Sequence, residues 1–206
     1  MLLRLFSLLF FTFSVTIYSQ SKELIDSLNS ITDSERKVQL FLKIALEIKN
    51  SDWERAIKYI DLAEAEAKKT NDSNLNLAQV YCTVAKLYNS KEAFDIALQY
   101  YLKAYEIYKS KNKTEEASKL ENNLAIIYAQ GKNKEKALKF FLNVYHYQKT
   151  KKDPVKLVKM LNNIGTIYLQ RNLDSSLFYY QKAYKINKKI KENTLKIYVC
   201  TNLARP

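Results

Sequence analysis

An internal repeat with a period of 40 residues runs through this chain and limits the folds that it can adopt. The segment Leu120–Gln130 aligns with Met160–Gln170, and each contains an Asn-Asn pair with a tyrosine five residues beyond it. The same offset backwards finds Cys82–Tyr88 and then Leu42–Ile48. Repeats of this length are typical of solenoids, in which one supersecondary unit cannot bury its apolar face until its neighbours stack on it.

A second pattern recurs between these segments with the spacing of one helix face. A small residue is followed four positions later by a large apolar residue and seven positions later by another small or branched one, which places all three on one side of a helix. The pattern begins at Ala56, Ala97, Ala137 and Ser176. Because the chain has only 2 Gly and 2 Pro, few positions interrupt a helix. The sequence therefore predicts an all-α fold with two amphipathic helices per repeat.

The combined pattern resembles the tetratricopeptide repeat (TPR), over roughly residues 35 to 204. The matching elements are aromatic-x2-Leu-Gly/Ala-x2-Tyr, a turn, and Ala-x3-aromatic-x2-Ala. The resemblance implies helical hairpins stacked into a right-handed superhelix. Small residues at Ala45, Ala85, Ala125 and Gly165 would let the facing helix approach closely. The departures are a period of about 40 rather than about 34, Glu121 and Leu161 at an aromatic position, and Ser176 at an alanine position.

Local signals divide the chain into consecutive segments. Thr32–Glu35 has the form of a capping box at the start of the first long helix, and Asp153-Pro154 places a capping residue before a proline at the first helical position. We expect a signal peptide at 1–19, a short capping segment at 20–33, hairpins at 34–70, 73–110, 114–150 and 154–191, and the first helix of an incomplete fifth repeat at 192–206.

The N-terminal segment has the layout of a secretory signal peptide. Arg4 precedes an uncharged, largely apolar stretch from Leu5 to Tyr18, and Ser19 and Gln20 begin a polar chain. The stretch is shorter than the approximately 20 residues of a membrane span. We expect cleavage near Ser19 and a periplasmic or membrane-associated location, with an uncleaved N-terminal anchor as the alternative.

No motif for catalysis, a cofactor or a metal occurs. The sequence has no glycine-rich phosphate loop, paired-histidine motif or Cys-x-x-Cys, and its one histidine, His146, stands alone. Cys82 and Cys200 lie three repeats apart, too far for a disulfide, so we expect free thiols or an intermolecular bond. We expect no enzyme activity, no cofactor and no metal.

The resemblance implies that one face of each first helix lines a concave peptide-binding groove. We take this face to be the side of each first helix opposite its packed residues. Across the repeats, the positions on this side are rich in amides and lysines and contain no acid. Amides both donate and accept hydrogen bonds, as a peptide backbone requires. Lys119 with Asn123, and Lys159 with Asn163, resemble the carboxylate-holding pairs of some TPR proteins. The alternative is that asparagine is merely tolerated on a solvated face. The candidate groove residues are Lys86, Lys119, Asn122, Asn123, Lys159, Asn162, Asn163 and Thr166.

The formal net charge of +13 favours anionic partners. We expect a protein or peptide partner with acidic side chains or a C-terminal carboxylate. Lysines gather near the ends of the second helices, where they complement the helix dipole. The alternative is that these lysines contact an anionic membrane surface. We expect no nucleic acid. Self-association through the open C-terminal repeat is a further expectation.

Two functions agree with these observations. The first is an exported, non-catalytic scaffold that binds peptide or protein in its groove. The second is a truncated extracytoplasmic sensory region of a membrane histidine kinase or transcriptional regulator. The signal segment, followed by Ile25–Leu28 and a capped helix, resembles the extracytoplasmic TPR regions of bacterial sensor and signalling proteins.

Overall fold

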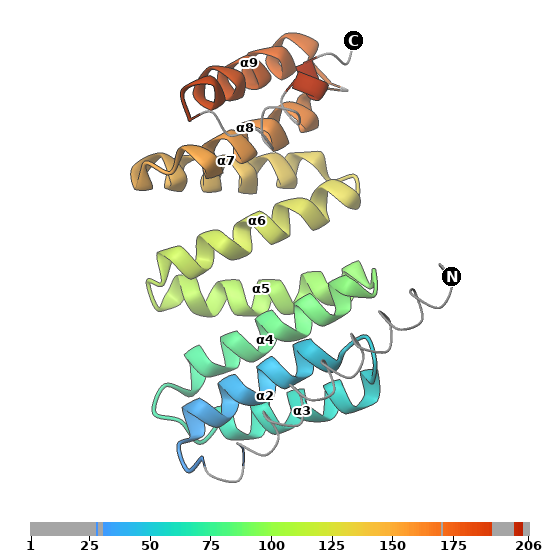
Figure 1. Cartoon of the computed structure of the whole chain (residues 1–206), viewed down its shortest axis with the longest axis vertical. Coiled ribbons are helices and arrows are strands. Elements are labelled where there is room, and N and C mark those ends of the chain that lie inside the picture. Colours follow the sequence, from blue (N-terminus) through green and yellow to red (C-terminus); the bar gives the residue numbers. More distant parts are fainter. Residues whose placement is uncertain (1–27, 29–30, 170, 191–199, 204–206) are drawn as a thin grey trace, which may run out of the picture. The chain divides into compact units, whose positions relative to one another are not determined.

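The computed structural model describes residues 28, 31–169, 171–190 and 200–203. These residues contain helices and no strand. The helices are α2 (Ser34–Ile48), α3 (Trp53–Ala67), α4 (Ser73–Ser90), α5 (Phe94–Ser110), α6 (Thr114–Gln130), α7 (Lys134–Lys151), α8 (Pro154–Tyr168) and α9 (Leu173–Ile190) (Figure 1). Residues 200–203 are also helical. The expected signal peptide, nearly all of the 20–33 segment and most of the expected fifth-repeat helix lie outside the described residues.

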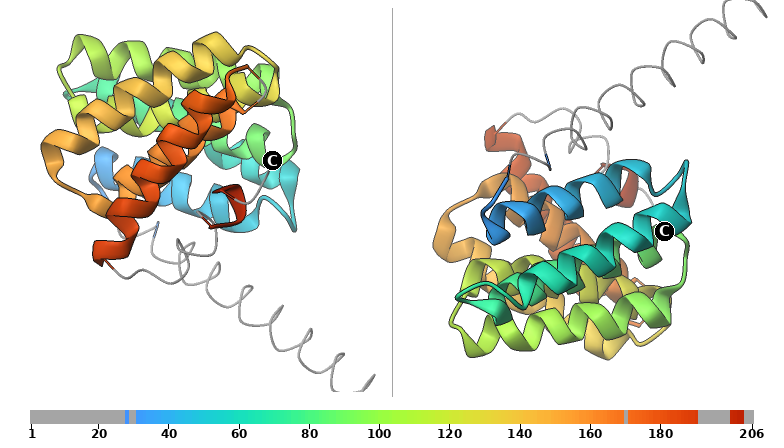
Figure 2. Two further views of the ribbon diagram at one scale, coloured as in Figure 1. Left: turned by 90° about the horizontal axis from the view of Figure 1, so that it is seen from above. Right: turned by 90° about the horizontal axis from the view of Figure 1, so that it is seen from below.

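Consecutive helices pack as antiparallel hairpins: α2 with α3, α4 with α5, α6 with α7, and α8 with α9. Figure 2 shows α2 and α3, in blue and cyan-green, side by side and running in opposite directions. The chain divides into two compact units, residues 1–111 and 112–206. In the first unit α4 packs against both α2 and α3, and in the second unit α7 packs against α8. Each unit therefore stacks one hairpin on another, as a helical-repeat fold requires.

Side-chain caps fix where several helices begin. The carboxylates of Asp33, Asp52 and Asp72 each accept from the backbone N–H three residues on, at the starts of α2, α3 and α4. The predicted capping box is wrong in its first residue, because Asp33 and not Thr32 is the N-cap of α2. Asp153 caps α8 and Pro154 is its first residue, as the sequence predicts.

The interface within each hairpin is built on small side chains. Ala45, Ala85, Ala125 and Gly165, and opposite them Ala56, Ala97, Ala137 and Ser176, are all fully or almost fully buried. Bulky partners fill the remaining space, including Ile60, Tyr101, Phe141 and Tyr180 at equivalent positions. The small-against-large packing predicted from the repeat is therefore confirmed.

A stacked aromatic pair recurs near the turn of three hairpins. Tyr88 stacks on Tyr100 with 2° between the rings, Tyr128 on Phe140 with 6°, and Tyr168 on Tyr179 with 5°. Each pair joins the end of a first helix to the beginning of a second helix. The tyrosines of these pairs therefore pack within their own hairpins.

The loops share a left-handed residue at repeating positions. Glu92 and Lys132 have φ of 59° and 62° between the helices of two hairpins, and Asn112 and Lys152 have φ of 55° at the ends of second helices. Each pair is one repeat apart. The repeat therefore extends to backbone geometry, although no glycine occupies these left-handed positions.

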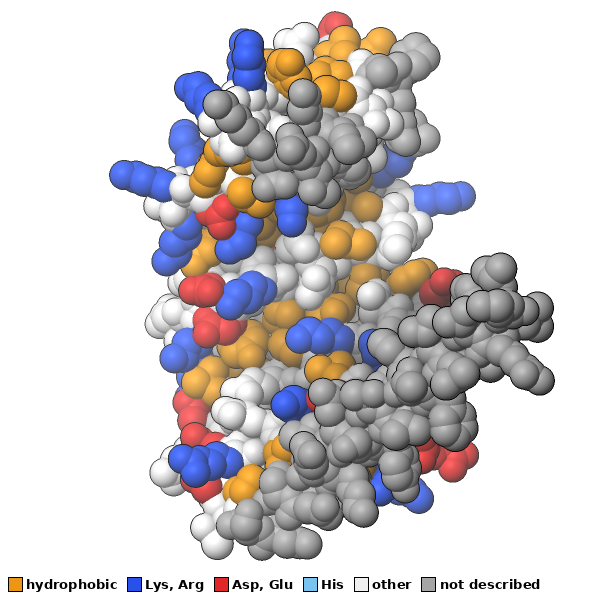
Figure 3. All heavy atoms as spheres, viewed as in Figure 1, with side chains coloured by type: hydrophobic (Ala, Val, Ile, Leu, Met, Phe, Trp, Pro, Cys, Tyr) orange, Lys and Arg blue, Asp and Glu red, His pale blue; other side chains and the backbone are white. Residues whose placement is uncertain are grey.

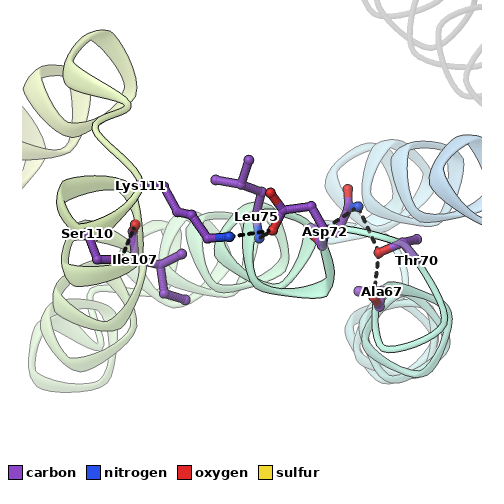
Figure 4. Close-up of polar contacts among 8 residues, drawn as sticks. Ala67, Thr70, Asp72, Leu75, Ile107, Ser110 and Lys111 are labelled. Atoms are coloured by element: carbon purple, nitrogen blue, oxygen red, sulfur yellow. Dashed lines mark hydrogen bonds and ion pairs between the residues drawn. The ribbon is translucent and has the colours of Figure 1, made fainter.

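In the first unit, polar contacts tie the inter-helix loops to the helix ends (Figure 4). Lys111 Nζ, just after α5, lies 3.3 Å from the Asp72 carboxylate that caps α4. The buried Asn76 amide donates to Thr70 Oγ1 at 2.9 Å, and that hydroxyl donates to the Ala67 carbonyl at 2.7 Å. These bonds hold the α3–α4 connection against α4 and the end of α5.

Candidate functional site: a basic cleft in the second unit

A cleft of about 540 Å³ opens within the second unit, where α6 begins, α7 ends and α8 begins. It brings together four of the groove residues predicted from the sequence, and these four come from two different repeats. These are Lys119, Asn122 and Asn123 from α6 and Lys159 from α8. The remaining lining residues are Glu115, Ser118, Val144, Tyr147, Gln148, Lys151, Asp153, Lys156 and Met160.

Charge in the cleft is predominantly positive. Four lysines and two carboxylates line it, which leaves a net charge of +2. Lys119 Nζ pairs with Glu115 at 2.8 Å, and Lys156 Nζ pairs with Asp153 at 3.2 Å. Lys151 and Lys159 form no ion pair with a described residue. In Figure 3, Lys and Arg side chains project from the edge where α6 begins and α7 ends.

Neighbouring lysine residues lower the pKa of both carboxyl groups in the cleft. The hydrogen bond and charge of Lys119 hold the pKa of the Glu115 carboxyl below its ordinary value, and the same bond raises the pKa of Lys119. The pKa of Asp153 is lowered mainly by the backbone N–H of Lys156, with the Lys156 side chain adding to the effect. Both acids are therefore ionised at neutral pH, and each holds one lysine of the cleft.

Two buried oxygens at the cleft lack a hydrogen-bond partner among the described residues. They are Ser118 Oγ and Asn122 Oδ1, one turn apart on α6. Ser118 is only 3% exposed. Buried polar atoms are nearly always paired, but neither of these atoms is exposed to solvent, so a ligand in the cleft could pair with them only after the side chains turn.

Asn162 is wrong as a groove residue, because it is fully buried. Its Nδ2 donates to the Val158 carbonyl at 3.0 Å, and its Oδ1 accepts from Asn202 Nδ2 at 3.3 Å. The two asparagines occupy the same slot one repeat apart. Because α8 packs against α9 on one side and residues 200–203 lie beside Asn162, this slot faces inward. Leu42 in the equivalent slot of α2 is likewise buried.

The other three groove residues predicted from the sequence lie outside the cleft. Asn163 is half-buried on α8. Thr166 Oγ1 contacts the Asn162 carbonyl and the Tyr180 hydroxyl, both at 3.0 Å, and it lines a different hollow that includes Lys132 and Arg171. Lys86 is exposed on α4 of the first unit.

Sequence reasoning missed the residues that the end of α7 contributes. Tyr147, Gln148 and Lys151 line the cleft, and the Lys151 ammonium lies 5.4 Å from the centre of the Tyr147 ring. The sequence predicts a groove on the first helices alone, whereas this cleft lies where the end of a second helix meets the start of the next first helix. The lysines at second-helix ends were the signal available in the sequence.

Both cysteines are free, and they differ in environment. Burial raises the pKa of the Cys82 thiol to about 11 and that of the Tyr101 hydroxyl to about 12. Cys200 is exposed. A desolvated thiol is a poor nucleophile at neutral pH, which makes Cys82 a packing residue.

No helix among the described residues has the length and apolar character needed to cross a membrane.

Solved structures share this architecture at low sequence identity. BtubC (BKLC) from P. vanneervenii aligns with a TM-score of 0.78 and 18% identity, over 92% of this chain and 79% of BtubC. A putative kinesin light chain with TPR-like repeats from Podosopora anserina aligns with a TM-score of 0.71 and 14% identity, over 85% of this chain and 87% of the other.

A third similar structure is the Rap conjugation gene regulator of plasmid pLS20, solved in complex with the Phr* peptide. Its TM-score is 0.65 at 15% identity, over 91% of this chain and 53% of the regulator. The chain thus spans about half of the regulator's length. Together these likenesses establish the all-α, TPR-type helical-repeat fold that the sequence predicted.

No curated protein sequence matches the chain. A family model described as soluble NSF attachment protein, SNAP, does match it, over residues 30–202. That range takes in all the described hairpins and the helical residues at 200–203 up to Asn202. The chain therefore belongs to the soluble NSF attachment protein (SNAP) family of TPR-like helical-repeat proteins.

Proposed function

We propose that the protein is a non-catalytic interaction module whose basic cleft binds a peptide with acidic side chains or a free C-terminal carboxylate. The observation that carries the proposal is the convergence of Lys119, Asn122, Asn123 and Lys159, from two successive first helices, on one cleft. Lysines supply charge for carboxylates, and the amides can pair with a peptide backbone.

The amide side chains of the cleft favour a peptide over other anions. Asn122 and Asn123 line the cleft with amides that both donate and accept hydrogen bonds, and a peptide offers backbone N–H groups beside its carboxylates. An anionic lipid surface offers negative charge but few such donors. The Rap regulator with its Phr* peptide is a protein of this fold with a peptide partner, and the SNAP family is described by its attachment to another protein.

We further propose that the module works outside the cytoplasm. The support is the layout of residues 1–20, with one basic residue before an apolar stretch and a small residue at its end. Detection of the mature chain in the periplasmic fraction, beginning near Ser19 or Gln20, would support this location. Recovery from the cytoplasm with Met1 intact would contradict it.

Fluorescence anisotropy with a labelled octapeptide of alternating Asp and Ser, carrying a free C-terminus, tests the proposed binding. We expect Lys119→Ala combined with Lys159→Ala to weaken binding about tenfold or more at low salt. The matched control combines Lys43→Ala with Lys86→Ala. This control removes the same charge from exposed positions on α2 and α4, and we expect little change.

Three results would contradict the proposal or redirect it. Equal affinity for the cleft variant and the unchanged protein would show that the cleft is not the site. Equal weakening in both double variants would indicate a general charge effect. Binding to anionic lipid vesicles but not to the octapeptide would favour a membrane partner. Circular dichroism of each variant checks that it is folded.

A further inference from the structure

The ammonium group of Lys119 already forms an ion pair with a carboxylate of the same helix. Its Nζ lies 2.8 Å from Glu115 Oε1, one turn earlier on α6. Both side chains are largely exposed, at 67% for Lys119 and 59% for Glu115, and both line the cleft. The Glu115 carboxylate therefore holds the position on Lys119 that a ligand carboxylate would need.

Resting on the proposed function, we infer that Glu115 is an internal competitor for Lys119, so that an acidic ligand binds by exchange with it. The ligand carboxylate takes over Lys119, and Glu115 swings into solvent. Lys159, which has no ion pair with a described residue, offers the first free contact. Glu115 thereby sets how much anionic charge a ligand must carry to bind.

The geometry allows this exchange at Glu115 and opposes it at Asp153. The Lys119–Glu115 pair is exposed, and an exposed pair between neighbouring turns contributes little to folding. Asp153, in contrast, accepts the backbone N–H of Lys156 at 3.0 Å as the cap of α8. Moving Asp153 would uncap the helix, so its carboxylate stays beside Lys156, whereas the Glu115 carboxylate can leave Lys119.

The exchange makes an unusual prediction, namely that removal of a cleft residue tightens binding. Glu115→Gln keeps the size of the side chain but removes its charge. It frees Lys119 and also removes a negative charge near the incoming carboxylate. We expect about three- to tenfold tighter binding of the Asp-Ser octapeptide at low salt. The gain should shrink at about 1 M salt, where the screening length is about 3 Å.

The matched control is Glu135→Gln. Glu135 also lies in the second unit and also forms an ion pair, at 3.5 Å from Arg171, but it lies outside the cleft. The change in net charge is the same as for Glu115→Gln. We therefore expect the control to leave the affinity within about twofold of the unchanged protein.

The outcomes separate this inference from the function on which it rests. Tighter binding for Glu115→Gln alone would support exchange. Equal affinity for Glu115→Gln and the unchanged protein, with binding still lost in the Lys119→Ala and Lys159→Ala double variant, would overturn the exchange and leave the cleft as the site. Equal tightening in Glu115→Gln and Glu135→Gln would also overturn it, as a long-range charge effect. No binding by any form would overturn both.

Discussion

Gly165 and Tyr180 determine how closely α8 and α9 approach each other. A Cβ added at Gly165 would lie 2.6 Å from Tyr180 Cε1 and 2.7 Å from its Cδ1. The ring is almost completely buried, and its hydroxyl lies 3.0 Å from Thr166 Oγ1. In two other hairpins Ala85 and Ala125 stand at the position of Gly165, Tyr101 and Phe141 stand at the position of Tyr180, and all four are buried. The glycine here therefore makes room for an aromatic ring that is held in place by a polar contact.

Gly165→Ala should destabilise the protein by about 1–3 kcal/mol, because the ring must leave its position in a packed interface. Thermal unfolding followed by circular dichroism measures the effect. The chain's other glycine provides a matched control. A Cβ at Gly131 would meet only the Ile127 and Tyr128 carbonyls, at 3.5 and 3.9 Å, so Gly131→Ala should be neutral or slightly stabilising. An unchanged melting temperature for Gly165→Ala would contradict the packing described here.

At the scale of elements, the turns between helices carry conformational strain. The chain from α6 to α7 passes through Gly131, whose φ is −73°, and then Lys132, whose φ is 62°. The glycine therefore precedes the residue that adopts the left-handed conformation. Lysine in that conformation is disfavoured by about 1–2 kcal/mol, and glycine is not.

Lys132→Gly should stabilise the protein by about 0.5–1 kcal/mol, the relief of strain exceeding the added freedom of the unfolded chain. Chemical denaturation gives the change in the free energy of unfolding. Lys139→Gly, at an exposed position inside α7, is the control and should cost about 1 kcal/mol. A loss of stability in both variants would show that Lys132 is not strained.

The helices could be predicted from the sequence because their signals are local. Asp153-Pro154 defines the start of α8, and the spacing from Ala137 to Phe141 defines the buried face of α7. The inward position of Asn162 could not be predicted in this way. Its burial depends on contacts with residues 200–203, a whole repeat away. The contribution of Tyr147 to the cleft is missed for the same reason, since it requires knowing how α7 leads into α8.

At the scale of the whole molecule, the two units differ in how their helix-end lysines are used. In the first unit Lys68 and Lys69 pair with glutamates of their own helix, and Lys111 pairs with Asp72. In the second unit the cleft gathers Lys151 and Lys159 without ion pairs to described residues. Three helix-end lysines of the first unit are thus neutralised by acids, whereas the cleft of the second unit presents two lysines without an acidic partner among the described residues.

Nuclear magnetic resonance can locate the bound peptide on the protein. The chain without residues 1–19 is labelled with ¹⁵N and titrated with the Asp-Ser octapeptide. The cleft predicts that backbone signals shift at the start of α6, the end of α7 and the start of α8, including Lys119, Asn123, Tyr147 and Lys159. Signals of Lys43 and Lys86 in the first unit should stay in place. Shifts centred on the first unit, or no shifts at all, would contradict the assignment of the cleft as the peptide-binding site.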